Sequence, residues 1–92
     1  AQNNAQPNSP ALMQAKNSVE IAYSQMQLDS TQWVRYQKLM AANSIAKNEY
    51  EQIKVRYEKS KKDWENAQEN YEQTKRQAKE QLIVNRSQKE IN

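Results

Sequence analysis

Mainly apolar residues recur every 3.5 positions on average in this 92-residue chain, and this repeat is the feature that most constrains its fold. With steps that alternate three and four, it falls in the first half at Leu12, Ala15, Val19, Ala22, Met26, Asp29, Trp33, Tyr36 and Met40. With the same steps, it falls in the second half at Ala46, Tyr50, Ile53, Tyr57, Ser60, Trp64, Ala67, Tyr71, Thr74 and Ala78. A repeat sustained this long predicts a coiled-coil seam rather than a single surface helix on a globular core.

The stretch between the two halves, residues 41–44, contains neither Gly nor Pro, yet the pattern favours a reversal there. If the chain folds back around Asn43, the two repeats stay in mirror register, and most layers set a large side chain against a small one, such as Trp64 against Ala22. A single continuous helix would give no reason for the two repeats to match in this mirror register. Asn43 can take the left-handed conformation that Gly usually takes, and we expect Ser44 to cap the second helix.

We therefore predict an all-α fold, an antiparallel two-helix coiled-coil hairpin with a helix over about 10–42, a turn near Asn43 and a helix over about 45–87. Ser9 followed by Pro10 is typical of a helix start. We expect residues 1–9 to form a flexible arm, residues 10–88 the hairpin and residues 89–92 a frayed end. Because the second arm is longer than the first, we also expect the chain to be a fragment of a larger protein.

Large side chains and one carboxylate are predicted to fill the seam. They are Trp33, Tyr36, Tyr50, Ile53, Tyr57, Trp64, Tyr71 and Asp29. Asp29 faces Tyr57 in the mirror register, so a carboxylate–phenol hydrogen bond would satisfy this polar residue in the seam. We expect the aromatic rings to pack against the partner helix rather than stack on nucleic-acid bases, which requires exposed rings beside a basic groove.

Composition excludes several classes of function. The chain has no Gly, His or Cys, so a phosphate-binding loop, a zinc site of the usual kind, a thiol nucleophile and an imidazole base are not expected. We predict no enzyme, no catalytic residues, no cofactor and no metal. The net charge of +3 comes from interspersed charges, which indicate a solvated helical surface rather than nucleic-acid binding. No window is apolar enough for a membrane span, so this segment is not expected to cross a membrane.

The predicted tip of the hairpin has two interpretations. Arg35, Lys38 and Lys47 lie close to the turn, while Leu39 and Ile45 lie beside the seam. In the first interpretation the two apolar residues shield the last seam layer and the basic residues are merely solvated. In the second, an exposed apolar pair surrounded by positive charge forms a docking knob for a partner protein.

The sequence around the turn resembles the hairpin tip of periplasmic membrane fusion proteins, the haemolysin-D-type family. The residues that carry the resemblance are Arg35 and Leu39, with Ile45, Glu49, Tyr50 and Glu51 after the turn. The tip pattern of this family is Arg, then Leu four residues later, then Ser seven residues after that. This chain has Ala46 at the Ser position. The resemblance extends over roughly residues 10–80, and its specific part covers residues 35–51.

The resemblance implies a function as well as a fold. The chain would be the non-catalytic hairpin of an adaptor in efflux or secretion, inserted between two halves of a lipoyl-like β domain. Its tip, with Arg35, Leu39, Ala46, Lys38 and Ile45, would dock onto an outer-membrane TolC-like channel. The parent protein would lie in the periplasm, anchored to the inner membrane beside a transporter, and would assemble as a hexamer.

Two other functions remain open from the residues alone. The chain could be a purely structural or scaffold coiled coil with no channel partner. It could also be a helical nucleic-acid binder, which the absence of a basic block disfavours.

Overall fold

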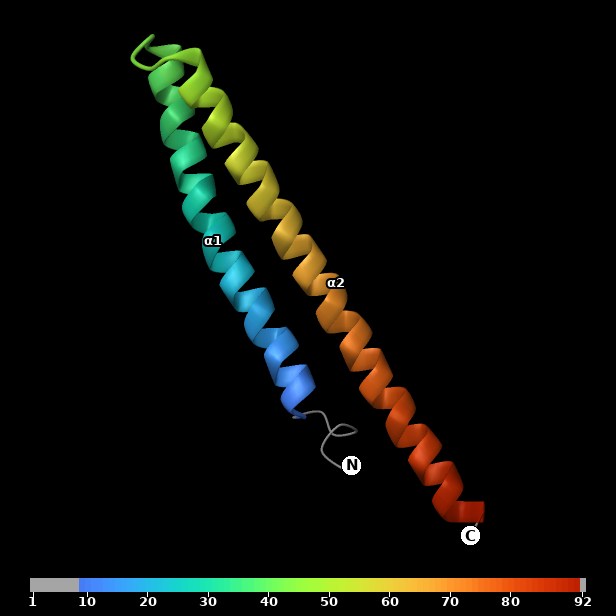
Figure 1. Cartoon of the computed structure of the whole chain (residues 1–92). Coiled ribbons are helices and arrows are strands. Elements are labelled where there is room, and N and C mark those ends of the chain that lie inside the picture. The colour runs from blue at the N-terminus through green and yellow to red at the C-terminus, as the bar shows by residue number, and fades with distance from the viewer. Residues whose placement is uncertain (1–8, 92) are drawn as a thin grey trace. The chain divides into compact units, whose positions relative to one another are not determined.

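The computed structural model describes residues 9–91, with the backbone alone at residues 85 and 87–91, and it contains two helices (Figure 1). Helix α1 spans Pro10–Ala41 and helix α2 spans Lys47–Ile91. Over residues 9–91 there is no strand. The predicted all-α antiparallel helical hairpin is confirmed.

Helix α1 begins at the predicted cap. The Ser9 hydroxyl accepts a hydrogen bond from the backbone N–H of Leu12 at 3.2 Å, and the Ser9 carbonyl accepts one from Met13 at 2.9 Å. Pro10 occupies the first helical position, where its missing N–H would have no helical partner in any case. Ser9 is 3% exposed, so its side chain satisfies a backbone donor that water does not reach easily.

Helix α1 ends in a Schellman motif without glycine. Asn43 has a φ of 57°, the left-handed conformation predicted for it. Its N–H donates to the carbonyl of Met40 at 3.0 Å, and the N–H of Ser44 donates to the carbonyl of Leu39 at 2.8 Å. These two bonds satisfy carbonyls at the end of α1 and reverse the chain.

Helix α2 begins and ends later than predicted. Its first helical bond runs from the N–H of Tyr50 to the carbonyl of Ala46 at 3.2 Å, so Ala46 is the capping residue. The prediction that Ser44 caps α2 is wrong, because the Schellman motif holds Ser44 at the end of α1. Its hydroxyl donates to the carbonyl of Ala42 at 3.4 Å. At the other end, α2 continues to Ile91 rather than stopping near residue 87, so the expected frayed end at residues 89–92 is helical as far as Ile91.

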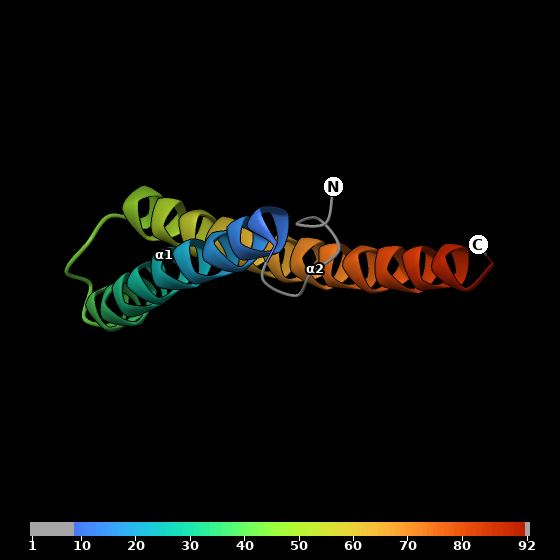
Figure 2. The same ribbon diagram turned by 90° about the horizontal axis from the view of Figure 1, so that it is seen from below.

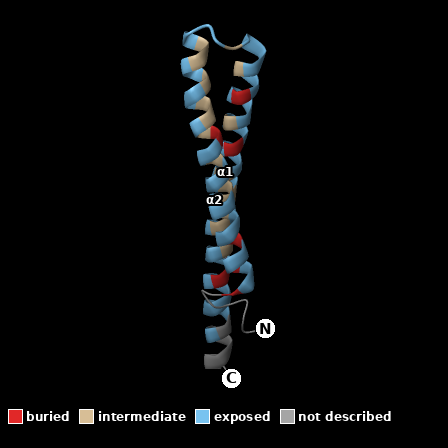
Figure 3. Cartoon of the chain, turned by 90° about the vertical axis from the view of Figure 1, so that its left-hand side faces the viewer, coloured by how far each residue is buried: buried red, intermediate tan, exposed pale blue. Residues whose placement is uncertain are grey.

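The chain divides into two compact units. One unit, residues Glu20–Asn66, contains the turn and the parts of α1 and α2 next to it. In this unit the two helices run antiparallel on either side of the turn (Figure 2). Buried and half-buried residues lie on the sides where these helices face each other near the turn (Figure 3).

The second unit joins the beginning of α1, up to Val19, to the end of α2, from Ala67. Its buried apolar side chains are Leu12, Ala15 and Ala78. Apart from Ser9, the predicted flexible arm lies outside the described residues.

Candidate functional site

The tip of the turn-containing unit presents basic side chains around partly covered apolar ones. Arg35 and Lys38 are exposed on the last turns of α1, and neither forms a salt bridge with another described residue. Leu39 and Ile45 are half-buried on either side of the turn, and Ala46 is exposed. The five residues predicted for partner binding therefore lie at one end of this unit, and its two basic side chains are exposed.

An aromatic pair supports the tip from below. The rings of Trp33 and Tyr50 lie with their centroids 5.0 Å apart and their planes tilted by 40°. This distance and tilt are in the range of favourable aromatic pairs. Ile53, another of the predicted seam residues, is buried at 8% exposure. The position of the tip therefore depends on packed rings of both helices rather than on the turn alone.

Below the aromatic pair, the seam contains a buried polar cluster. Asp29 is 4% exposed and Ser60 is 5% exposed. The Ser60 hydroxyl donates to Asp29 Oδ2, and Gln25 Nε2 donates to Asp29 Oδ1 and Oδ2 at 3.3 and 3.2 Å. The prediction that Asp29 forms a hydrogen bond with Tyr57 is wrong. Ser60, one turn further along α2, reaches the carboxylate instead. The carboxylate is thus satisfied in the seam by donors from both helices.

A second ring pair was missed by sequence reasoning. The centroids of Tyr23 and Trp64 are 5.4 Å apart, at an interplanar angle of 51°. Tyr23 flanks the repeat beside Ala22, so its ring covers Trp64 from outside the seam. The sequence did contain a signal for this pair. Tyr23 is adjacent to Ala22, a small seam residue whose predicted partner is the large Trp64.

Most predicted seam residues face inward in the unit to which they belong. Ile53 and Asp29 are buried, and the half-buried ones are Trp33, Tyr36, Tyr50, Tyr57, Trp64 and Tyr71. Ala46 is the exception, because it precedes α2 and is exposed. The 3.5-residue repeat therefore identified the inner face of both helices correctly.

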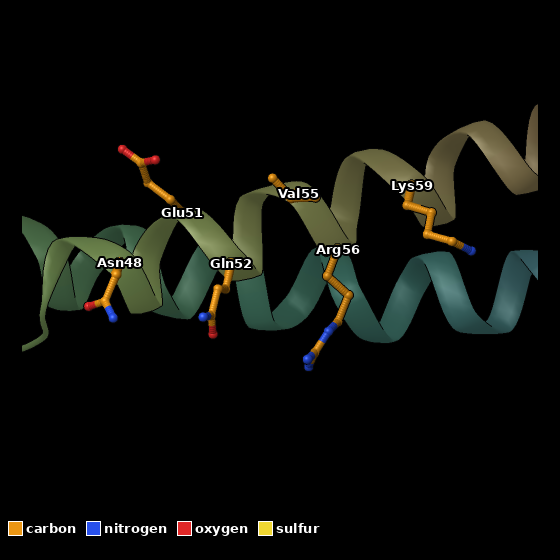
Figure 4. A pocket seen from close by; sticks show the side chains of 6 residues that line it. All are labelled: Asn48, Glu51, Gln52, Val55, Arg56 and Lys59. Atoms are coloured by element: carbon orange, nitrogen blue, oxygen red, sulfur yellow. The ribbon is translucent and has the colours of Figure 1, made fainter.

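Each unit has a hollow on the surface of its described residues. In the turn-containing unit, Asn48, Glu51, Gln52, Val55, Arg56 and Lys59 line an open hollow of about 590 Å³. Figure 4 shows that Asn48, Gln52 and Arg56 project on one side of α2 while Glu51 projects on the other. Since every lining residue belongs to the same helix, this hollow has no opposing wall to enclose a ligand.

The hollow in the second unit, about 460 Å³, lies between the start of α1 and α2. Its lining includes the apolar residues Leu12, Ala78 and Leu82 and the basic residues Lys75 and Lys79. The Lys75 ammonium lies 5.7 Å from the centroid of the Tyr71 ring, within the range of a cation–π contact. This basic side chain is therefore already engaged by its own helix.

The electrostatics of the described surface are those of ordinary solvated helices. Lys59 and Asp63 form a salt bridge of 2.8 Å, and the hydrogen bond and charge of Asp63 raise the pKa of the Lys59 ammonium above 10.5. Among the described residues, no group of three or more His, Cys, Asp or Glu could hold a metal ion. Within the same part of the chain, neither helix has a stretch long and apolar enough to cross a membrane.

Comparison with known proteins gives no relative. No protein-family model, no curated protein and no solved structure matches this chain.

Proposed function

We propose that this chain is the α-helical hairpin of a periplasmic adaptor that links an inner-membrane transporter to an outer-membrane TolC-like channel in efflux or secretion. The observation that carries this proposal is the tip, where exposed Arg35 and Lys38 surround half-buried Leu39 and Ile45. The spacing of Arg35 and Leu39 is that of the membrane fusion protein tip. In this proposal the hairpin is a non-catalytic spacer, and the parent protein acts as a hexamer in the periplasm.

The physical case for docking rests on accessibility and charge. A guanidinium without a described ionic partner can form bidentate hydrogen bonds with a carboxylate or a backbone carbonyl pair of a partner protein. A half-buried leucine beside it offers apolar area that a partner could cover without reorganising the turn. Arginine is among the residues that are enriched at protein–protein interfaces and that contribute most to their binding energy.

A binding measurement with matched variants tests this proposal. Arg35→Ala should weaken binding to a purified TolC-like channel by about 30-fold, the effect of losing a hot-spot side chain, and leave the melting temperature unchanged. Arg56→Ala is the control, since Arg56 is also an exposed arginine of the same unit and lies on α2, ten residues after Ala46. Equal binding by the two variants would reject docking through Arg35, and melting of the Arg35 variant would make this residue structural.

The scaffold alternative is favoured by one observation. Leu39 and Ile45 are half-buried rather than fully exposed, as expected if they only shield the last seam layer. The sequence of the parent gene on both sides of this segment would separate the two functions. Lipoyl half-motifs on both flanks would support the adaptor, and further helical repeats would support a scaffold.

A further inference from the structure

Charge is divided very unequally between the two helices. Helix α1 carries five charged residues, which are Lys16, Glu20, Asp29, Arg35 and Lys38, and α2 carries the other twenty. Between Glu20 and Arg35 the only charged residue of α1 is Asp29, and that carboxylate is buried in the seam. In the turn-containing unit, the outward side of α1 therefore has an acidic residue, Glu20, at one end and a basic residue, Arg35, at the other, with no charged residue between them.

This surface, the outer α1 face, consists of residues that helical spacing places on one side of α1 and that are all exposed. They are Glu20, Ile21, Ser24, Gln27, Leu28, Thr31, Val34 and Arg35. Ile21 is 70% exposed, Leu28 56% and Val34 46%. Exposed aliphatic side chains and the absence of charge in the centre are the compositional marks of a protein–protein interface.

Two polar side chains in the middle of this face already have partners within α1. Gln27 Nε2 donates to the Tyr23 hydroxyl at 2.7 Å, and the Thr31 hydroxyl donates to the carbonyl of Gln27 at 3.0 Å. Covering the face would therefore leave few buried donors without an acceptor. Desolvation of this part of α1 costs less than desolvation of a charged helix surface.

We infer that the outer α1 face pairs with the same face of a second copy of this chain, with the two α1 helices antiparallel. The charge pattern argues for this occupant, because antiparallel pairing sets Glu20 of each copy opposite Arg35 of the other. The same register sets Ile21 opposite Val34 and brings the two Leu28 side chains next to the two-fold axis. Parallel pairing would instead oppose Glu20 to Glu20 and Arg35 to Arg35.

Within the turn-containing unit, no face of α2 is an equally good partner. Val55, 63% exposed, lies on the outer side of α2 among Glu51, Lys54 and Lys59. Pairing the outer α1 face with this surface would bury charges against Ile21 or Leu28, which is costly without a counter-charge. At ~1.5 Å per residue the self-paired face is about 22 Å long, so we expect a weak dimer whose population rises with concentration.

Cysteine cross-linking tests the geometry, because the chain has no cysteine of its own. Leu28→Cys should form a disulfide-linked dimer on oxidation, whereas Val55→Cys, equally accessible on α2, should not. Ile21→Cys and Val34→Cys should each stay monomeric alone and form a mixed dimer when combined. Dimers of Ile21→Cys alone, no mixed dimer, or equal cross-linking of the Leu28 and Val55 variants would overturn the proposal.

Sedimentation equilibrium of the whole chain tests the energetics. Glu20→Arg should weaken the dimer about tenfold, because two-fold symmetry turns two attractive pairs into repulsive ones, and the double variant Glu20→Arg with Arg35→Glu should restore it. Leu28→Asn should weaken it by a similar factor and Val55→Asn should have no effect. A chain that is monomeric at every concentration, or a double variant no better than the single one, would exclude this pairing.

The inference goes beyond the proposed function and does not depend on it. Leu28 lies outside the tip, so Leu28→Asn should affect pairing and leave channel binding unchanged, whereas Leu39→Ala should do the reverse. Arg35 belongs to both surfaces, so pairing and docking through this residue would exclude each other. Failure of one proposal is therefore distinguishable from failure of the other.

Discussion

The two units of the molecule close their seams with different materials. In the turn-containing unit, the Trp33–Tyr50 ring pair and the buried Asp29–Ser60 hydrogen bond lie between the helices, and Tyr23 covers Trp64 from outside the seam. In the other unit the buried apolar residues are one leucine and two alanines. Rings and a polar pair have specific partners, whereas alanines pack acceptably against many neighbours. The difference teaches that register is specified mainly near the turn.

The largest effect should come from removing a ring in the turn-containing unit. Trp64→Ala deletes a half-buried indole that packs against Tyr23, so we expect a loss of about 3 kcal/mol in the free energy of unfolding. Urea titration followed by far-ultraviolet circular dichroism measures it, and Trp64→Phe should lose much less. Leu12→Ala in the other unit should cost less, about 2 kcal/mol, because fewer contacts are lost. Equal losses would contradict the contrast between the units.

The next largest effect concerns the polar cluster. Ser60→Ala removes a donor from the buried Asp29 carboxylate, so the free energy of unfolding should fall by about 1–3 kcal/mol. The control is Ser18→Ala, because the Ser18 hydroxyl donates to the carbonyl of Gln14 on an exposed helix surface. A Ser60 variant that is as stable as the Ser18 variant would show that the hydrogen bond between the helices does not contribute.

Substitutions at the capping residues before the two helices should change the free energy of unfolding by smaller amounts and in opposite directions. Ala46→Ser supplies a capping hydroxyl and, with Glu49 three residues later, a capping box, so we expect a gain of about 1 kcal/mol. Ser9→Ala removes the hydroxyl that accepts from Leu12 and should lose about the same amount. Thermal denaturation measures both. If Ala46→Ser is not stabilising, then the start of α2 is not limited by its missing cap.

The smallest effect is expected at the surface. Lys59→Ala should hardly change the melting temperature at neutral pH, since both side chains of the Lys59–Asp63 pair are exposed. Asp63 raises the pKa of Lys59 in the folded chain above its ordinary value of 10.5. Any stabilisation that the pair gives is therefore present at neutral pH and is lost as the pH rises through the pKa that Lys59 has in the folded chain. Melting curves of both proteins from neutral to alkaline pH should therefore converge. A large difference at neutral pH would contradict a merely solvated pair.

Much of the fold could be predicted from the sequence, because one period governs it. A step of three and four marks the inward side of each helix, and Asn43 is the residue between the two repeats best suited to a left-handed conformation. Antiparallel packing, however, sets each seam residue between two residues of the opposite helix. The period alone therefore could not decide whether Tyr57 or Ser60 meets Asp29.

The start of α2 was harder to predict, because two motifs compete for Ser44. As a cap it would begin α2 early, but its N–H bonds back to Leu39 and places it at the end of α1. Of the tip, the sequence could predict which residues gather there and that Arg35 is accessible. How far Leu39 and Ile45 are covered depends on the geometry of the turn, which no periodicity encodes.

The Asp29–Ser60 hydrogen bond has a mechanical consequence for the unit around the turn. If the helices slid past each other by one turn, the Asp29 carboxylate would lose the Ser60 hydroxyl and meet Tyr57 or Trp64, whose ring would have to fit where a serine packs, which is costly in so tightly buried a place. Axial load applied at the turn should then be carried by the two helices as a single strut of fixed length, without ratcheting.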